Sequence, residues 1–383
     1  MHTKSIQDIN IKKSRILIRV DYNVPIKDGI VVDDYRIQCS MQTIKHCLEN
    51  SCSIVIMSHI GRPKQTGDNR NLSMRPVYNH LKLMLDNQIF FSDDCVSSES
   101  IEISSNLKEG EIHILENLRF HAGEKDNDYS FAKLLSQHGQ IYINDAFGTS
   151  HRAHASNNLI TQFFKQKGIG FLLKKEISYL VNHLDNPQKP LCLIIGGAKI
   201  DGKINLIDNF INKIDFLLIG GAMAFTFLKA KGTNIGLSLY QDDKIEYAAN
   251  LMNKLDRKNI PTVLPIDILA SRTIDTKPRH VLINEIDDNE GGFDIGPETC
   301  KLFGSFIAKS KTLIWNGPMG VAEVERFKCG TEYISSCINS ATKNKNLTSI
   351  VGGGDTVASI DRTQINFSHL STGGGASLEL LFL

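Results

Sequence analysis

Short, almost continuous runs of isoleucine, leucine and valine recur along the chain, and they constrain its fold more than any other feature. Unbroken apolar runs of this length are typical of strands buried on both faces. Amphipathic stretches lie between several of the runs, and strands alternating with helices predict parallel sheets covered by helices on both sides. The predicted strands are 15–21, 53–58, 112–115, 140–144, 191–195, 215–219, 262–266, 312–315 and 349–351, and the clearest predicted helices are 35–50, 75–86, 128–138 and 244–258.

The length of the chain predicts two lobes. At 383 residues it exceeds the size at which a single hydrophobic core stops growing. Residues 174–184 have helical spacing, and Asp185-Asn186-Pro187 ends that helix before the next strand. We therefore predict an α/β protein of two doubly wound, Rossmann-like parallel-sheet lobes joined by a hinge helix. The predicted boundaries are 1–172 for the first lobe, 173–187 for the linker helix, 188–365 for the second lobe, and 366–383 for a C-terminal segment that returns to the first lobe.

Composition argues against several classes of protein. The formal net charge is +1, so no overall field favours nucleic acid or an anionic membrane. The longest apolar stretch, 216–230, is too short to span a bilayer, and the N-terminus does not resemble a signal peptide. The eight cysteines include no C-x-x-C pair, which is typical of reduced, buried thiols. We predict a cytoplasmic protein that binds neither nucleic acid nor membrane.

Arginines and histidines gather at the predicted strand ends of the first half. In an open parallel sheet, ligands bind at the edge formed by the carboxyl ends of the strands. The residues at or just after these ends include Asp21, Asn23, Arg36, His59, Arg62, Arg119, His121, Asn144, Asp145, His151, Arg152 and His154. A guanidinium group offers paired donors that match phosphate and carboxylate oxygens. The first lobe is therefore predicted to bind a small polyanion.

Simpler interpretations exist for these residues taken one at a time. Any single arginine or histidine is about as easily explained as a surface residue paired with a nearby carboxylate. That explanation weakens when all of them lie at strand ends of one lobe. His151 and His154 are suitable zinc ligands, but no cysteine or third histidine lies at metal-ligand spacing, so we discount a zinc site.

Glycines mark the predicted strand ends of the second half, in the segments 196–199, 220–222, 316–320 and 352–356. Glycine lets the backbone approach a phosphate closely, and a helix N-terminus offers free N–H groups. Tight turns would explain single glycines. They do not explain why Lys199 and Lys203 lie beside a glycine pair, or why Asp355 follows three glycines. The second lobe is therefore predicted to bind a nucleotide.

The common nucleotide motifs are incomplete. Gly197 to Lys203 has the G-x-x-x-x-G-K spacing of a P-loop, but Ile204 stands where serine or threonine would bind magnesium. No G-x-G-x-x-G follows the first strand, which weakens a dinucleotide interpretation. A third glycine run, 371–377, precedes an apolar stretch, 378–383, that we expect to be a helix with its first amides open to an anion.

Nine segments together resemble the phosphoglycerate kinase family from end to end. They are VDYNVP at 20–25, SHIGRP at 58–63, ENLRFH at 116–121, NDAFGTSHRAHAS at 144–156, GGAKIDGKI at 196–204, DIGPET at 294–299, WNGPMGVAE at 315–323, GGGDT at 352–356 and STGGGAS at 371–377. They cover both lobes in order, which makes the resemblance specific. It implies reversible, Mg²⁺-dependent phosphoryl transfer between 1,3-bisphosphoglycerate with ADP and 3-phosphoglycerate with ATP, in glycolysis and gluconeogenesis, by a monomer.

The resemblance also implies roles for individual residues. Phosphoglycerate would be held by Asp21, Asn23, Arg36, His59, Arg62, Arg119 and Arg152. The nucleotide would be bound by Gly197, Ala198, Lys203, Gly220, Gly221, Gly296, Asn316, Pro318, Glu323, Gly353, Gly354, Asp355 and Thr356, with Asp355 on the magnesium ion. The phosphoryl group in transfer would meet Arg36, Lys199 and the amides of Gly353, Gly373 and Gly374.

The implied chemistry is coherent. A carboxylate acceptor is already ionised at neutral pH, so no general base is required. The main cost is repulsion between two anions, which cationic side chains and the metal must offset. Because the two sites lie on different lobes, the resemblance implies hinge closure at the linker helix, through a pairing of Glu176 with His369.

A few positions depart from the usual residues of the family. Asp201-Gly202 replaces a Ser-Asp pair between the two lysines, and Ala222 replaces a glycine. Ala322 stands where an aromatic residue is often found beside the nucleotide. The sequence therefore supports the base-binding part of the site least.

Two alternatives remain open. A kinase of another carboxylate, such as acetate or an amino acid, would not need so many arginines for a second anionic group on its substrate. A non-catalytic regulatory protein that binds sugar phosphates or nucleotides would be expected to lack Arg36, Lys199 or Asp355, and all three are present.

Overall fold

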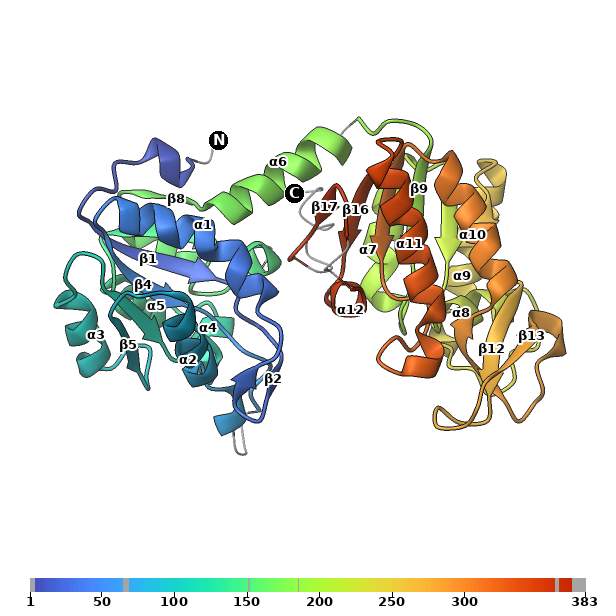
Figure 1. Cartoon of the computed structure of the whole chain (residues 1–383), viewed down its shortest axis with the longest axis horizontal. Helices are drawn as coiled ribbons and strands as arrows, with labels where there is room; N and C mark the ends of the chain where they lie inside the picture. The colour runs from blue at the N-terminus through green and yellow to red at the C-terminus, as the bar shows by residue number, and fades with distance from the viewer. Residues whose placement is uncertain (1–3, 65–68, 151, 185, 362–364, 374–383) are drawn as a thin grey trace. The chain divides into compact units, whose positions relative to one another are not determined.

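The computed structural model describes residues 4–64, 69–150, 152–184, 186–361 and 365–373. The chain divides into two compact units, Met1–Ser178 and Tyr179–Leu383, and each contains a six-stranded sheet (Figure 1). Every strand pair described in these two sheets is parallel. The predicted fold class of two parallel-sheet α/β cores is confirmed.

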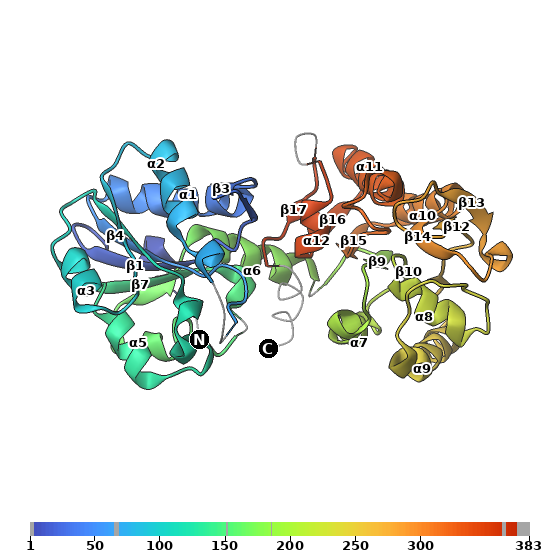
Figure 2. The ribbon, with the colours of Figure 1, turned by 90° about the horizontal axis from the view of Figure 1, so that it is seen from below.

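The sheet of the first unit has the strand order β5-β6-β4-β1-β7-β8. Figure 2 shows α1 and α2 on one face of this sheet and α3 and α5 on the other. In β1, Ile16 and Ile18 belong to the core that includes α1 and α2, whereas Leu17 belongs to the core that includes α5. The bounds are β1 Arg15–Val20, β4 Ser53–Met57, β5 Ile89–Ser92, β6 Ile112–Leu115, β7 Ile141–Asp145, β8 Lys167–Ile169, α1 Tyr35–Glu49, α2 Arg75–Met84, α3 Ser98–Ser105, α4 Ala122–Lys125 and α5 Tyr129–Ser136, with a hairpin of β2 Ile26–Lys27 and β3 Ile30–Val31.

The main sheet of the second unit has the order β11-β10-β9-β15-β16-β17. In Figure 2, α7, α8 and α9 lie on one side of it and α10 and α11 on the other. Trp315 of β15 is buried in a core that includes Phe303 of α10 and Ile334 of α11. The bounds are β9 Leu191–Ile195, β10 Phe216–Ile219, β11 Thr262–Val263, β15 Thr312–Asn316, β16 Thr348–Gly352, β17 His369–Leu370, α7 Ile204–Phe210, α8 Met223–Ala230, α9 Ile245–Arg257, α10 Pro297–Lys309, α11 Cys329–Lys343 and α12 Gly354–Ala358.

A small antiparallel sheet in the second unit was not predicted. Its strands are β12 Asp267–Ser271, β13 Arg279–Leu282 and β14 Gly291–Ile295, in the order β13-β12-β14. These strands contain aspartate, serine, arginine, histidine and glycine, so they lack the unbroken apolar runs on which the prediction relied. The predicted strand 262–266 is also too long, because β11 ends at Val263. The other predicted strands agree with the structure to within one residue at each end.

The predicted linker overlaps α6 (Phe171–Leu184), the helix in which the chain passes from the first unit to the second. The exact domain boundaries, and the return of residues 366–383 to the first lobe, remain predictions. His151, Gly374 and the helix predicted at 378–383 lie outside the described residues. Among the helices that the structure does describe, none is long and apolar enough to cross a membrane.

Two buried histidines share one serine in the first unit. Ser104 Oγ lies 2.8 Å from Nδ1 of His113 and 2.6 Å from Nδ1 of His138. His138 Nε2 donates to the carbonyl oxygen of Cys95 at 2.8 Å, and Ser92 Oγ lies 2.8 Å from His113 Nε2. Burial lowers the pKa of His113 to about 3 and that of His138 to about 4. Both rings are therefore neutral in the folded protein at neutral pH.

Acid should destabilise the protein through these two histidines. A histidine in the unfolded chain gains a proton below about pH 6.5, well before His113 or His138 does in the folded unit. The stability that the neutral rings contribute is complete above that pH and falls towards pH 4, by about 1.4 kcal/mol per pH unit for each ring. We expect the His113→Gln/His138→Gln variant to be less stable than the wild type at pH 7, yet to lose less stability between pH 7 and pH 5 in urea unfolding. Equal losses in the two proteins would contradict this account.

Candidate functional site

The carboxyl ends of β1, β4 and β6 carry the first predicted site. Asp21 follows β1, His59 lies just after β4, and Arg119 lies in the 3₁₀ turn after β6. Arg36 is in the first turn of α1, as expected from the sequence. We refer to Asp21, Arg36, His59, Arg119 and Arg152 as the arginine cluster, because the charges of these residues act on one another's pKa values.

Asp21 orients the first arginine of the cluster. Its Oδ2 atom lies 2.5 Å from NH1 of Arg36, and its Oδ1 atom lies 4.0 Å from Nε2 of His59. Burial opposes ionisation of Asp21, but nearby positive charge, that of Arg36 first, outweighs burial and holds the pKa of the carboxyl group well below its usual range. Asp21 is therefore ionised, and the half-buried guanidinium of Arg36 is held beside it.

Arg119 has a donor that can take an additional acceptor. NH1 donates to the carbonyl oxygen of Gly61 at 2.6 Å, whereas the buried Nε atom has no acceptor among the described residues. Burial lowers the pKa of this guanidinium to about 10, and the charges of Arg152 and Arg19 act in the same direction. An anion bound here would receive the free N–H and relieve the repulsion between the cations.

Asn23 and Arg62 complete the first predicted site. The side-chain oxygen of Asn23 accepts a hydrogen bond of 2.8 Å from the backbone N–H of Gly61, so it fixes the turn that precedes Arg62. Arg62 is exposed and has no ion-pair partner in the part of the chain that the structure describes. Its guanidinium is therefore available to a ligand.

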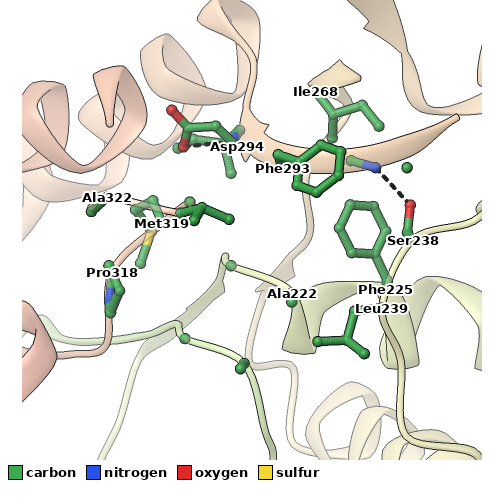
Figure 3. A pocket seen from close by; sticks show the side chains of 18 of the residues that line it. Ala222, Phe225, Ser238, Leu239, Ile268, Phe293, Asp294, Pro318, Met319 and Ala322 are labelled. Carbon is green, nitrogen blue, oxygen red and sulfur yellow. Dashed lines mark hydrogen bonds between the residues drawn. The ribbon is translucent and has the colours of Figure 1, made fainter. Parts of the chain in front are cut away.

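The second predicted site is a cavity of about 650 Å³ beside the carboxyl ends of β9, β10 and β15 (Figure 3). Six residues expected to bind nucleotide line it: Gly197, Ala198, Gly221, Pro318, Glu323 and Asp355. The others expected there, Lys203, Gly220, Gly296, Asn316, Gly353, Gly354 and Thr356, are not among the residues that line this cavity. Their contact with a nucleotide remains a prediction.

Sequence reasoning missed the apolar wall of this cavity. Figure 3 shows the rings of Phe225 and Phe293 close together, with Ile268 beside them. Phe293 and Ile268 come from β14 and β12, so the unpredicted antiparallel sheet brings them to the site. Phe293 lines the same cavity as Ala322, and thus an aromatic side chain is present although position 322 lacks one. A signal was available, since Phe293 directly precedes the DIGPET segment.

Glycines hold the loops of the second site against one another. A Cβ atom on Gly221 would overlap the backbone nitrogen of Gly197 and lie 2.7 Å from its carbonyl oxygen. Likewise, a Cβ on Gly317 would overlap the carbonyl group of Gly196. Gly221 and Gly317 also have positive φ angles of 63° and 101°. Glycine is therefore required here for packing between loops, a reason different from the close approach to phosphate that the sequence predicts.

Several predicted residues support the cavity from beside it. Lys203 Nζ donates to the side-chain oxygen of Asn316, and burial lowers the pKa of the lysine, while the charge of Asp355 opposes that shift. Thr356 Oγ1 accepts a 2.7 Å hydrogen bond from the N–H of Gly317. At Gly353, whose φ is 101°, a Cβ would lie 2.8 Å from Thr356 Oγ1. The Gly317–Thr356 bond joins α12 to the end of β15, and the Lys203–Asn316 bond joins the residue before α7 to the same strand end.

Gly296 has a structural role that the prediction did not anticipate. It is the residue before α10, and a Cβ there would overlap the carboxylate of Asp267. That carboxylate accepts hydrogen bonds of 2.9 and 2.6 Å from the backbone N–H groups of Glu298 and Thr299. The N-terminus of α10 is thus already occupied by an anionic side chain.

Four residues remain from the predicted catalytic and hinge sets: Lys199, Gly373, Glu176 and His369. Lys199 is exposed and has no ion-pair partner among the residues that the structure describes. The N–H of Gly373 donates to Ser371 Oγ at 3.1 Å. Glu176 is buried in the first unit, whereas His369 is buried in the second and stacks on Tyr179 at 4.7 Å. The pairing of Glu176 with His369 remains a prediction.

Comparison with known proteins identifies the family. The phosphoglycerate kinase family model matches residues 6–382. The chain belongs to the phosphoglycerate kinase family. The predicted family and the prediction of an enzyme, a kinase, are thereby confirmed.

The relatives cover nearly the whole chain. The phosphoglycerate kinase of Finegoldia magna is 44% identical over 388 residues, covering 100% of this chain and 96% of the relative, and that of Prosthecochloris aestuarii is 44% identical over 386 residues, covering 100% and 97%. Among solved structures, the phosphoglycerate kinase from Coxiella burnetii superimposes with a TM-score of 0.80 at 35% identity and covers 99% of this chain and 96% of its own. The one from Pyrococcus horikoshii OT3 has a TM-score of 0.85 at 28% identity, with coverage of 98% and 95%.

The packing of the glycine loops can be tested at Gly221. We expect Gly221→Ala to lower the stability of the second unit by about 2–4 kcal/mol, because alanine adds strain in a left-handed conformation and a steric overlap. The same variant should weaken ADP binding. The matched control is Gly202→Ala, whose Cβ would have no atom within 4 Å and should leave the melting temperature unchanged or slightly raised. Equal melting temperatures for the two variants would refute the packing role.

Proposed function

We propose that this chain catalyses reversible, Mg²⁺-dependent phosphoryl transfer between 1,3-bisphosphoglycerate with ADP and 3-phosphoglycerate with ATP, in glycolysis and gluconeogenesis. The observation that carries the proposal is the arginine cluster, in which Arg36 is already paired but the buried Nε–H of Arg119 has no acceptor in the described part of the chain. The acid 3-phosphoglycerate presents both a carboxylate and a phosphate, so it can use several guanidinium groups at once. Membership in the phosphoglycerate kinase family supports the same substrates.

The first unit would bind and orient the acid. Arg62, Arg119 and Arg152 would take its anionic groups, while Arg36, held by Asp21, would face the carboxylate that receives the phosphoryl group. That carboxylate is ionised at neutral pH and needs no base, so the contribution of the protein is positioning and compensation of charge. This explains why the arginines of the cluster would suffice on this side without a group that takes a proton from the acid.

The second unit would bind the nucleotide in the cavity of Figure 3. The base would lie against Phe293 and its apolar neighbours, and Glu323 at the rim would accept hydrogen bonds from the ribose. The phosphates would then extend towards the backbone at Gly197 and Ala198 and the start of α12. The exposed ammonium of Lys199, which has no ion-pair partner among the described residues, would meet the phosphoryl group in transfer.

The residues present fit a magnesium ion bound together with the nucleotide. Asp355 is exposed and lines the cavity. The described residues contain no group of three or more histidine, cysteine, aspartate or glutamate side chains that could hold a metal. Magnesium in nucleotide sites takes one or two carboxylates and completes its shell with phosphate oxygens and water. Asp355 would therefore hold the ion, which when bound neutralises phosphate charge.

Transfer requires the acid and the nucleotide to meet, although their binding residues belong to different units. We propose that the two units close over their ligands during turnover, with residues 173–187 as the hinge and Glu176 with His369 as its coupled pair. The amides of Gly353, Gly373 and Gly374 would then stabilise the transferring group. We further propose that the enzyme is cytoplasmic, as its cysteines without a C-x-x-C pair suggest, and a monomer, as the resemblance implies.

A coupled assay tests the proposal directly. With 3-phosphoglycerate and Mg-ATP as substrates, we expect NADH to be consumed when the product is reduced by an added dehydrogenase. The same assay with acetate or an amino acid in place of 3-phosphoglycerate should show no turnover above background. Turnover with acetate but not 3-phosphoglycerate would replace the proposed acid, and tight binding of both ligands without turnover would favour a regulatory protein.

Arg36 can be tested by replacing it with methionine, which keeps an unbranched apolar stem but lacks the guanidinium group. We expect kcat to fall by about 100-fold or more, because a charge-stabilising donor at the reacting group is lost. The Kd for ADP, measured by calorimetry, should stay within twofold of wild type. The control is Arg75→Met, which removes an exposed guanidinium paired with Asp93 in the same unit and should leave kcat unchanged. A kcat near wild type in Arg36→Met would refute the assigned role.

Phe293 can be tested as the surface on which the base stacks. We expect Phe293→Ala to raise the Kd for ADP by about tenfold, because loss of base–aromatic stacking costs on the order of 1–3 kcal/mol. The KM for 3-phosphoglycerate should not change. Phe306→Ala, which removes a half-buried ring of α10, serves as the control for lost stability and should bind ADP normally. An unchanged Kd in Phe293→Ala would show that the base lies elsewhere.

A further inference from the structure

We propose that Glu124 and Ser156 are positioning residues which act through the buried Arg19 to hold His59 as a neutral ring, with its only N–H on Nε2, the nitrogen that lies on the side of Asp21. The inference deepens the proposed function, on which it rests, because His59 belongs to the arginine cluster. It is carried by a continuous chain of hydrogen bonds in the first unit.

The chain begins at Glu124, in the short helix α4. This side chain is completely buried. Its Oε1 atom accepts a hydrogen bond of 2.7 Å from the hydroxyl of Ser156, and its Oε2 atom accepts one of 3.0 Å from the backbone N–H of the same residue. Nδ1 of His154 lies 3.5 Å from Oε1. Burial opposes ionisation of Glu124, but the interactions with His154, Ser156 and Arg19 outweigh it and lower the pKa of the carboxyl group.

Ser156 links Glu124 to Arg19 through its hydroxyl group. A serine hydroxyl has a single proton, which is donated to Glu124, so its oxygen is left as an acceptor. Arg19 Nε donates to that oxygen at 3.0 Å. NH1 of Arg19 donates to the carbonyl oxygen of Val20, and the whole guanidinium is inaccessible to solvent. Two fixed acceptors therefore determine where the remaining nitrogen, NH2, must point.

NH2 of Arg19 lies 3.1 Å from Nδ1 of His59. A guanidinium group can only donate, so Nδ1 must be the acceptor and must carry no proton. The proton of the neutral ring is consequently on Nε2. A second proton, on Nδ1, would set an N–H against the N–H of Arg19.

The charges around His59 favour the same state. Burial lowers the pKa of His59, and the charges of Arg19, Arg119 and Arg36 lower it further, while that of Asp21 raises it. Nε2 lies 4.0 Å from Oδ1 of Asp21, which is beyond hydrogen-bond reach. Within the described part of the chain, the Nε2–H group thus has no close acceptor, and it is available to an anionic oxygen of the acid. His59 therefore acts as a fixed, uncharged donor among cations.

Glu124 and Ser156 also form hydrogen bonds through their backbone atoms, near the segment that contains Arg152. The backbone N–H of Ala155 donates to the carbonyl oxygen of Glu124 at 2.9 Å. The hydroxyl of Tyr142 donates to the backbone carbonyl oxygen of Ser156 at 2.8 Å. Removing only the hydroxyl of Ser156 leaves both of these backbone contacts in place. The variant Ser156→Ala therefore breaks the chain between Glu124 and Arg19 with little change elsewhere.

The test combines a spectrum that needs no substrate with a kinetic measurement. In ¹⁵N-histidine-labelled whole protein at pH 7, long-range ¹H–¹⁵N correlations should show the wild-type His59 as the neutral Nε2–H form, assigned with His59→Gln. In Ser156→Ala, the His59 nitrogen signals should shift, and the KM for 3-phosphoglycerate should rise about tenfold, because a charge-assisted bond that orients Arg19 is lost. The KM for Mg-ATP should stay within twofold. Ser100→Ala, which removes a buried hydroxyl of α3 in the same unit, should change neither the His59 signals nor either KM.

The outcomes separate this inference from the proposed function. A charged ring or an Nδ1–H form in the wild type would overturn it, even if the enzyme is fully active. A correct spectrum with unchanged His59 signals and KM in Ser156→Ala would overturn the positioning role. If Ser156→Ala does not fold, Glu124→Gln, which keeps the shape but loses the charge, should show the same shift in the spectrum and the same split between the two KM values. Absence of turnover in the wild type would refute the proposed function while the spectrum still tests the hydrogen-bond chain.

Discussion

A strand that is buried on both faces has no exposed side along which to present polar groups, so a parallel sheet of such strands can carry chemistry only at its ends. Both six-stranded sheets of this protein are of this kind, with β1, β4, β9 and β15 almost entirely buried. The parallel arrangement then brings the carboxyl ends of neighbouring strands to one edge. Asp21, His59 and Arg119 in one unit, and the glycine loops in the other, are consequences of that single constraint.

The two units would meet the demands of the proposed anion binding by different physical means. In the first unit, fixed cations lie close together, and burial and mutual repulsion act against their charge, as the lowered pKa of Arg119 shows. Asp21 offsets part of this repulsion, and Glu124, behind Ser156 and Arg19, contributes a second negative charge from the interior. Such a preorganised cluster stabilises an anion without having to rearrange when the anion arrives.

In the second unit, the close packing of backbone loops shapes the cavity that we propose for the nucleotide. Gly221 and Gly317 let the loops after β9, β10 and β15 approach one another more closely than any side chain would allow. Gly197 and Gly221 of these loops line the cavity. Its apolar wall comes from a separate antiparallel sheet, which adds Phe293 and Ile268 to a site whose polar residues come from the parallel sheet. In the proposed nucleotide complex, recognition of the base and of the phosphates would thus be divided between two sheets.

The amino-acid sequence by itself determined the alternation of buried strands with helices, the two-lobed organisation, and the residues at the carboxyl ends of the predicted strands, because apolar periodicity and glycine positions are local properties of a chain. It therefore predicted the arginine cluster, whose members all follow strands. It did not predict β12, β13 and β14, whose residues have no distinctive pattern, or the part that Phe293 has in the cavity. Only the tertiary structure decided these, together with the close approach of Gly221 to Gly197 and the hydrogen bonds that join Glu124 to His59. Such contacts join residues far apart in the chain, and their geometry depends on how whole elements pack, which no local pattern records.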